Sequence, residues 1–141
     1  MLRIEYSDYE ALRAHGEETY PNECCGVVAV AQGADVGQAQ AMSVRPTRNV
    51  HASPKRFEID GRDVLVAMSE FEAQGWEIGA IYHSHTHTAP YPSQTDVNFA
   101  ANWPGVEWII VGLSDAEHPE VRSYLIEEGV VREVALETVT V

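Results

Sequence analysis

Short apolar runs rich in β-branched residues alternate along this chain with longer segments whose apolar residues follow helical spacing. Residues 25–31 read Cys-Gly-Val-Val-Ala-Val-Ala, and residues 107–113 read Glu-Trp-Ile-Ile-Val-Gly-Leu. Runs of this length and composition are typical of buried strands. Because strand-like and helix-like segments follow one another in turn, the sequence predicts an α/β fold in which a mixed β-sheet is flanked by about three helices.

The clearest predicted helix covers residues 60–74. Asp60 is a suitable N-cap, and Val64, Leu65, Met68 and Phe71 recur at the spacing of one helical face. We expect these four side chains to face the core, and we expect the following glycine to end the helix.

The other elements are predicted from capping residues, turn residues and local periodicity. Ser7 and Glu10 have the spacing of a capping box, and Pro21 ends the helix that would follow. We expect helices at residues 7–20 and 93–102, a turn at 32–37, and strands at 2–5, 25–31, 38–44, 57–59, 78–82, 107–113, 121–127 and 130–136. The strand at 38–44 would pair with 25–31, and the last two strands would form a hairpin around Glu128-Gly129.

One domain is expected to span residues 1–141. A chain of this length hides roughly 68–70% of its unfolded surface when it folds, so it supports a core without disulfides. Apolar residues make up 45% and charged residues 22%, values that exclude disordered, collagen-like and coiled-coil classes. No repeat or linker marks a second domain.

Charge and cysteine content restrict the setting in which the protein works. The formal net charge of −13 repels phosphate backbones, which argues against nucleic acid as a partner. No apolar stretch is long enough for a membrane span, and we expect the cytoplasm. Cys24 and Cys25 are adjacent and suit a reducing compartment. The acidic surplus is most simply a solvated surface, with a saline habitat or a basic partner as open alternatives.

Chemistry is expected where the strand at 78–82 runs into His83-Ser84-His85. Side chains alternate across a strand, so His83 and His85 project to the same side and can bind one ion. Neutral imidazole is a common zinc ligand, and a catalytic zinc takes three protein ligands and keeps one position for water. Asp96 is the candidate third ligand, because the loop after His85 can fold back toward the strand end.

Alternative interpretations exist for three residues at or near this motif, namely Ser93, Asp96 and His87. Ser93 and Asp96 taken alone are explained by a helix cap. His87 continues the alternation of His83 and His85, so a three-histidine site is conceivable, but Pro90 and Pro92 indicate that the chain has left the strand. His15, His51 and His118 lack partners at ligand spacing, and we expect them to face solvent.

The sequence contains His83-Ser84-His85, then Ser93 and Asp96 at their spacing after it, and the upstream Pro21–Gly26 segment Pro-Asn-Glu-Cys-Cys-Gly. In these three features it resembles the signature of the JAMM (MPN-plus) metalloproteases. It is similar to the compact bacterial branch that trims ubiquitin-like sulfur-carrier proteins. This resemblance implies an MPN/JAMM fold, which is cytidine-deaminase-like. It implies zinc bound by His83, His85 and Asp96, Glu23 as general acid/base, and Ser93 as a hydroxyl that stabilises the oxyanion.

The resemblance also implies a substrate. We expect cleavage after the C-terminal tail of a ubiquitin-like or sulfur-carrier protein. Isopeptide cleavage on a conjugate is the alternative. A homodimer is one assembly that the sequence allows. A zinc deaminase would need His-x-Glu and Pro-Cys-x-x-Cys, which are absent from the sequence. A non-catalytic scaffold would normally have lost one of the ligands, and all of them are present.

Overall fold

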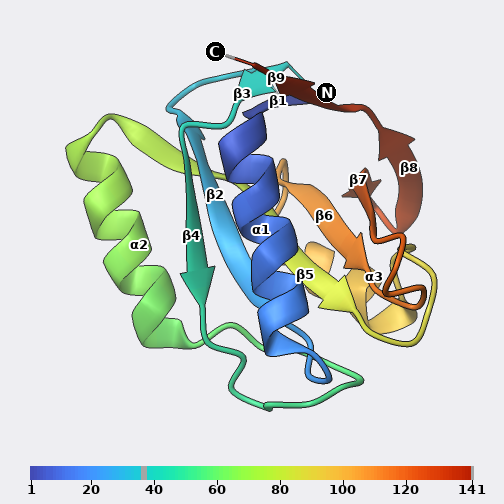
Figure 1. Cartoon of the computed structure of the whole chain (residues 1–141). Helices are drawn as coiled ribbons and strands as arrows, with labels where there is room; N and C mark the ends of the chain where they lie inside the picture. Colours follow the sequence, from blue (N-terminus) through green and yellow to red (C-terminus); the bar gives the residue numbers. More distant parts are fainter. Residues whose placement is uncertain (36–37, 141) are drawn as a thin grey trace.

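The computed structural model describes residues 1–35 and 38–140, which form three helices and two β-sheets (Figure 1). The helices are α1 (Tyr6–Thr19), α2 (Gly61–Ala73) and α3 (Gln94–Ala100). The strands are β1 (Leu2–Glu5), β2 (Cys25–Ala31), β3 (Ala39–Gln40), β4 (Ser43–Thr47), β5 (Trp76–His85), β6 (Glu107–Gly112), β7 (Glu120–Glu127), β8 (Val130–Val134) and β9 (Leu136–Val139).

The larger sheet has six strands in the order β4-β2-β5-β6-β7-β8. Its central pair, β5 and β6, is parallel, and the other neighbours are antiparallel. This confirms the predicted mixed sheet. A second sheet, β3-β1-β9, is parallel and brings the two ends of the described chain together. The sequence did not predict this second sheet, because its strands are short and pair only with distant parts of the chain.

Both faces of the larger sheet are buried at its central strands, as the apolar runs predicted. Successive residues alternate between two clusters, so that Val27 of β2 lies in one cluster and Val28 in the other. Ala67 of α2 and Ala100 of α3 belong to the first cluster, and Leu12 of α1 belongs to the second. Helix α1 therefore covers the face opposite to the one that α2 and α3 cover (Figure 1).

Helix α1 begins earlier than its expected capping box. It starts at Tyr6, directly after β1, and its N-cap is Glu5, whose side chain makes no capping hydrogen bond. The prediction that Ser7 caps this helix is therefore wrong. The strand leads straight into the helix, so Ser7 already lies within the first turn.

Helix α2 begins where the sequence predicted, but only part of its expected apolar face is buried. The Asp60 side chain accepts hydrogen bonds from the main-chain N–H groups of Arg62 and Asp63, as expected of an N-cap. Phe71 is buried, whereas Leu65 is 69% exposed and Met68 is 40% exposed. The prediction for Leu65 and Met68 is wrong, because the helix contacts the sheet through the narrower stripe that contains Ala67 and Phe71.

The segment before α2 also differs from the prediction. Instead of one strand at 38–44, the structure has β3 in the small sheet and β4 paired with β2. Residues 57–59 form only an isolated bridge between Ile59 and Asn49. The predicted turn at 32–37 extends to residues 36 and 37, which lie outside the described part of the chain.

The C-terminal hairpin is confirmed. Glu128 and Gly129 have φ angles of 51° and 78°, the left-handed pair that a tight two-residue hairpin turn requires. The predicted strand at 130–136 is divided into β8 and β9 where the chain passes from one sheet to the other.

Other expectations concern exposure and the membrane. Within residues 1–35 and 38–140, no helix is both long enough and apolar enough to cross a membrane. His51 and His118 are exposed, as predicted. His15 is not, because it is half-buried and its Nδ1 lies 2.8 Å from the hydroxyl of Tyr82.

Candidate metal centre

Strand β5 carries two histidines to one end of the sheet. His83 and His85 lie on the same side of the strand, as their spacing predicted, and both are buried, with exposed fractions of 0% and 5%. Their Nε2 atoms are 3.1 Å apart. The parallel pairing with β6 holds this strand end, since His85 lies opposite Gly112.

Helix α3 supplies a carboxylate to the same point. Asp96 lies in its first turn and is only 4% exposed. Its Oδ2 lies 3.1 Å from Nε2 of His83 and 3.2 Å from Nε2 of His85. The loop that follows β5 thus folds back as the spacing of these residues predicted, and the three side chains form a compact group that can hold a metal ion.

A reciprocal cap fixes the orientation of Asp96. The Ser93 side chain accepts a hydrogen bond from Asp96 N–H at 3.1 Å, and Ser93 N–H donates to Asp96 Oδ2 at 2.9 Å. The capping interpretation of these two residues is therefore correct for the helix start. It does not compete with the metal interpretation, because the same carboxylate also faces the two histidines.

The ring nitrogens of His85 have different roles. Its Nδ1 lies 2.9 Å from the carbonyl oxygen of Ala89, which can only accept, so we assign the ring proton to Nδ1. The Nε2 of the neutral ring is then an acceptor that faces a carboxylate oxygen at 3.2 Å. In the neutral ring these two acceptors would repel each other, and either a metal ion between them or a proton on Nε2 removes the repulsion. Burial would lower the pKa of His85, but its hydrogen bonds to Asp96 and to the carbonyl of Ala89 raise it.

The dimensions of the group also suit a metal ion. Tetrahedral zinc with ligands at about 2.0–2.1 Å would place neighbouring ligand atoms roughly 3.3–3.4 Å apart. The three observed separations, 3.1, 3.1 and 3.2 Å, are close to this. The donor set of two imidazoles and one carboxylate is typical of catalytic zinc sites.

Burial and charge act in opposite directions on these groups. Burial lowers the pKa of His83, against the opposing effect of Asp96, and so favours the neutral ring that a metal requires. Burial would raise the pKa of Asp96, but the two histidines and the N–H of Ser93 hold it well below its usual range. The carboxylate is therefore held ionised beside two imidazoles whose pKa values shift in opposite directions, downward for His83 and upward for His85.

His83 is oriented by an aromatic contact. Its Nδ1 is buried and has no hydrogen-bond partner within the described chain. The ring of Phe57 stacks on it with a centroid separation of 4.3 Å and an interplanar angle of 23°. The sequence did not indicate this role for Phe57, because the two residues are far apart in the chain.

Glu23 lies next to the three candidate ligand residues. Strand β2 pairs with β5 so that Cys25 is opposite His83, and continuing this antiparallel register places Glu23 beside His85. The Glu23 side chain is buried, with 5% of the residue exposed. Burial raises the pKa of Glu23 to about 7, with a further increase from Asp96 and an opposing effect from His85. A carboxyl group of this pKa can both accept and donate a proton near neutral pH.

His87 lies outside this group. It is exposed, and its ring makes an edge contact with Tyr20 at 6.2 Å. Among the described residues, the cluster of potential ligands at this strand end contains His83, His85 and Asp96. The geometry thus gives the third position to the carboxylate and not to a third histidine.

Comparisons with known proteins find relatives that match most of this chain. The chain is 34% identical over 133 residues to the CysO-cysteine peptidase of Mycobacterium tuberculosis, covering 94% of this chain and 88% of that protein. It is 34% identical over 128 residues to a probable TtuB-protein conjugate cleaving protease of Thermus thermophilus, covering 90% of this chain and 76% of that protein.

Solved structures show the same fold. A protein from Desulfitobacterium hafniense superposes with a TM-score of 0.83 at 29% identity, covering 99% of this chain and 92% of its own. A JAB1/MPN domain protein from Archaeoglobus fulgidus superposes with a TM-score of 0.61 at 17% identity, covering 97% of this chain and 98% of its own. The second similarity supports the α/β fold expected from the JAMM signature.

A family model describes the same region of the chain. Residues 7–127, which include the two histidines of β5, Asp96 and Glu23, match the model for prokaryotic homologues of the JAB domain. This chain belongs to the Prok-JAB family.

Proposed function

We propose that this protein is a zinc-dependent metallopeptidase that hydrolyses the bond after the C-terminal tail of a ubiquitin-like or sulfur-carrier protein. The observation that carries the proposal is the triangle of His83 Nε2, His85 Nε2 and Asp96 Oδ2, whose sides of 3.1, 3.1 and 3.2 Å suit three ligands of one tetrahedral ion. The JAB family and the names of the relatives support a peptidase of this kind.

The proposed ligands are His83, His85 and Asp96. Zinc bound there would polarise the scissile carbonyl and lower the pKa of a bound water to about 7. This role requires an open position beside Glu23, the buried carboxyl next to His85.

Glu23 acts as the general acid/base in this proposal. Its carboxylate takes a proton from the attacking water and later delivers it to the departing amine. A pKa of about 7 makes both protonation states accessible at neutral pH. Without this transfer the amine would have to leave as an unstable anion, so the reaction would stall.

Ser93 is proposed to stabilise the oxyanion. Its Oγ already accepts the N–H of Asp96, which leaves the hydroxyl hydrogen available to donate to substrate at the exposed end of α3. One well-placed donor of this kind can contribute about 3 kcal/mol to transition-state stabilisation.

The substrate class comes from the relatives. One is named for a peptidase that acts on CysO-cysteine, and another for a protease that cleaves TtuB-protein conjugates. We therefore place a peptide bond after a carrier tail first and an isopeptide bond in a conjugate second. A cytoplasmic location and a homodimeric assembly remain predictions.

The test uses purified protein and the sulfur-carrier proteins from the same genome, each with a C-terminal extension. Mass spectrometry should show chelator-sensitive removal of the extension, and an isopeptide-linked conjugate should be tested in parallel. Glu23→Gln should retain bound zinc and reduce turnover by about 10²-fold or more. Asp96→Ala should lose both zinc and turnover. A fully active Glu23→Gln enzyme would rule out this mechanism.

A further inference from the structure

The loop between β4 and α2, residues 48–60, contacts residues in and beside the candidate metal centre. Glu23 N–H donates to the carbonyl of Ser53 at 2.8 Å, and the Thr86 hydroxyl donates to the carbonyl of Pro54 at 2.9 Å. Phe57 of the same loop stacks on His83. The loop thus contacts the proposed general base and a proposed metal ligand.

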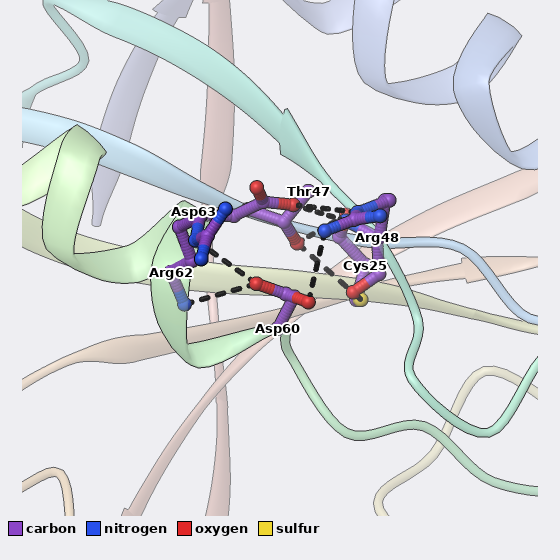
Figure 2. A network of polar contacts seen from close by, with 6 residues as sticks. All are labelled: Cys25, Thr47, Arg48, Asp60, Arg62 and Asp63. Carbon is purple, nitrogen blue, oxygen red and sulfur yellow. Dashed lines mark hydrogen bonds and ion pairs between the residues drawn. The ribbon is translucent and has the colours of Figure 1, made fainter.

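A polar network closes the base of this loop (Figure 2). Arg48 N–H donates to Asp63 Oδ2 at 2.8 Å, and the Arg48 guanidinium donates to Asp60 at 3.1 Å. Cys25 Sγ donates to the carbonyl of Arg48. These contacts fix where the loop leaves β4 and enters α2, but none of them reaches Glu23.

Asn49 makes that connection. Its Nδ2 donates to the carbonyl of Glu23 at 3.1 Å and to the carbonyl of Arg56 at 3.0 Å. Its Oδ1 accepts from the N–H groups of His51 and Glu58, each at 3.1 Å. A primary amide has two N–H donors and two acceptor lone pairs, so this side chain is fully used.

These four bonds have a specific consequence for the site. Glu23 lies between α1 and β2, and both its N–H and its carbonyl bond to the loop. The bonds of Asn49 to Arg56 and Glu58 lie on either side of Phe57. The side chain of Asn49 therefore ties the main chain of the proposed general base to the main chain on both sides of Phe57, whose ring stacks on His83.

We propose that Asn49 is a positioning residue for hydrolysis, which holds the Glu23 carboxyl in register with the metal ligands. This inference rests on the proposed function, because it assigns Asn49 a task only if Glu23 is the general acid/base. The metal ligands themselves are carried by β5 and α3, which Asn49 does not contact through its side-chain hydrogen bonds. Asn49 therefore affects turnover more than metal binding or substrate affinity.

Two substitutions separate positioning from simple loop stability. Asn49→Ala removes all four bonds, whereas Asn49→Asp keeps the oxygen acceptor for His51 and Glu58 and loses the donors to Glu23 and Arg56. If Asn49 acts through Glu23, both variants should lower kcat by about 10–100-fold with KM and zinc content unchanged. Wild-type kcat in Asn49→Asp, which lacks the donor to Glu23, would overturn the proposal.

A double-mutant cycle supplies the second readout. In a Glu23→Gln background, Asn49→Asp should have no further effect on the residual rate, because its target has already lost its function. Fully additive losses would also overturn the proposal. Asn102→Ala and Asn102→Asp, at an exposed position after α3, are the matched controls and should behave as wild type.

Cleavage by the wild-type enzyme distinguishes failure of the proposed function from failure of the role of Asn49. Absence of chelator-sensitive cleavage by the wild type would overturn the proposed function, and with it the role of Asn49. Cleavage by the wild type together with wild-type kcat in Asn49→Asp would overturn only the role of Asn49. Should Asn49→Ala not fold, as thermal unfolding would reveal, Asn49→Asp alone decides the outcome, since it preserves two of the four bonds.

Discussion

At the scale of single residues, Cys24 and Cys25 are neighbours that enter different parts of the core. Cys24 belongs to the cluster on the α1 face of the large sheet, and Cys25 belongs to the cluster on the face of α2 and α3. Both are buried, with exposed fractions of 1% and 0%. Burial raises the pKa of Cys24 to about 12 and that of Cys25 to about 11.

These two thiols should be inert in the folded protein. Only the thiolate is nucleophilic, and at pH 8 neither group is ionised to a useful extent. We expect no rapid reaction of the native protein with a disulfide reagent such as Ellman's reagent, and two reactive thiols per chain after denaturation. A thiol that reacts quickly in the native state would show that one of the two is accessible and activated.

The site residues differ in how well the sequence predicts them. His83 and His85 follow from the two-residue period of a strand, because that period alone places both rings on one side. Glu23 needed the family resemblance, since its approach to the site depends on the pairing of β2 with β5. The role of Asn49 could not be predicted from the sequence. Its Nδ2 donates to the carbonyl of Glu23, 26 residues earlier in the chain, and no local sequence spacing indicates such a bond.

At the scale of secondary-structure elements, the start of α2 depends on one carboxylate. Asp60 Oδ1 accepts from Arg62 N–H at 2.9 Å and from Asp63 N–H at 3.2 Å, while Oδ2 accepts from the Arg48 guanidinium (Figure 2). The first two bonds form the helix cap. The third is an ion pair with a side chain that is 73% exposed, a type that contributes little to stability.

This division predicts different effects for two substitutions at Asp60. Asp60→Ala should lower the free energy of unfolding by about 1 kcal/mol, because two N–H groups lose their acceptor. Asp60→Asn should cost only a few tenths of a kcal/mol, because asparagine caps as well as aspartate and only the exposed ion pair is lost. Urea unfolding curves measure both. Equal destabilisation by the two variants would mean that the ion pair matters more than the cap.

Element positions were predicted better than the faces that those elements bury. The apolar runs of β2, β5 and β6 are long enough to mark strands without knowledge of their partners. The exposed face of α2 was not predictable, because Leu65 and Met68 have the right spacing for a core face and tertiary contacts alone decide which stripe is covered. The small sheet was missed for a related reason, since β1, β3 and β9 pair over long distances in the sequence.

At the scale of the whole molecule, the candidate metal centre brings together parts of the fold that are otherwise connected by a loop. The two histidines belong to β5 in the middle of the large sheet, and Asp96 belongs to α3 on one face of it. The fold holds both Nε2 atoms within 3.2 Å of Asp96 Oδ2, an arrangement that the unfolded chain does not provide. The folded state should therefore bind the ion far more tightly than the unfolded chain does.

Removal of the metal should accordingly destabilise the entire domain. At a free-metal concentration about 100 times Kd, binding adds about 2.7 kcal/mol to stability, which corresponds to a rise in Tm of roughly 5–10 °C for a domain of this size. We expect a chelator to lower the Tm of the wild type by that amount and readdition of zinc to restore it.

In Asp96→Ala, which lacks one proposed ligand, the chelator should change Tm little. Glu23→Gln should respond as the wild type does, because Glu23 is not among the proposed ligands. An equal chelator effect in the wild type and Asp96→Ala would mean that the stabilising ion binds somewhere other than between β5 and α3.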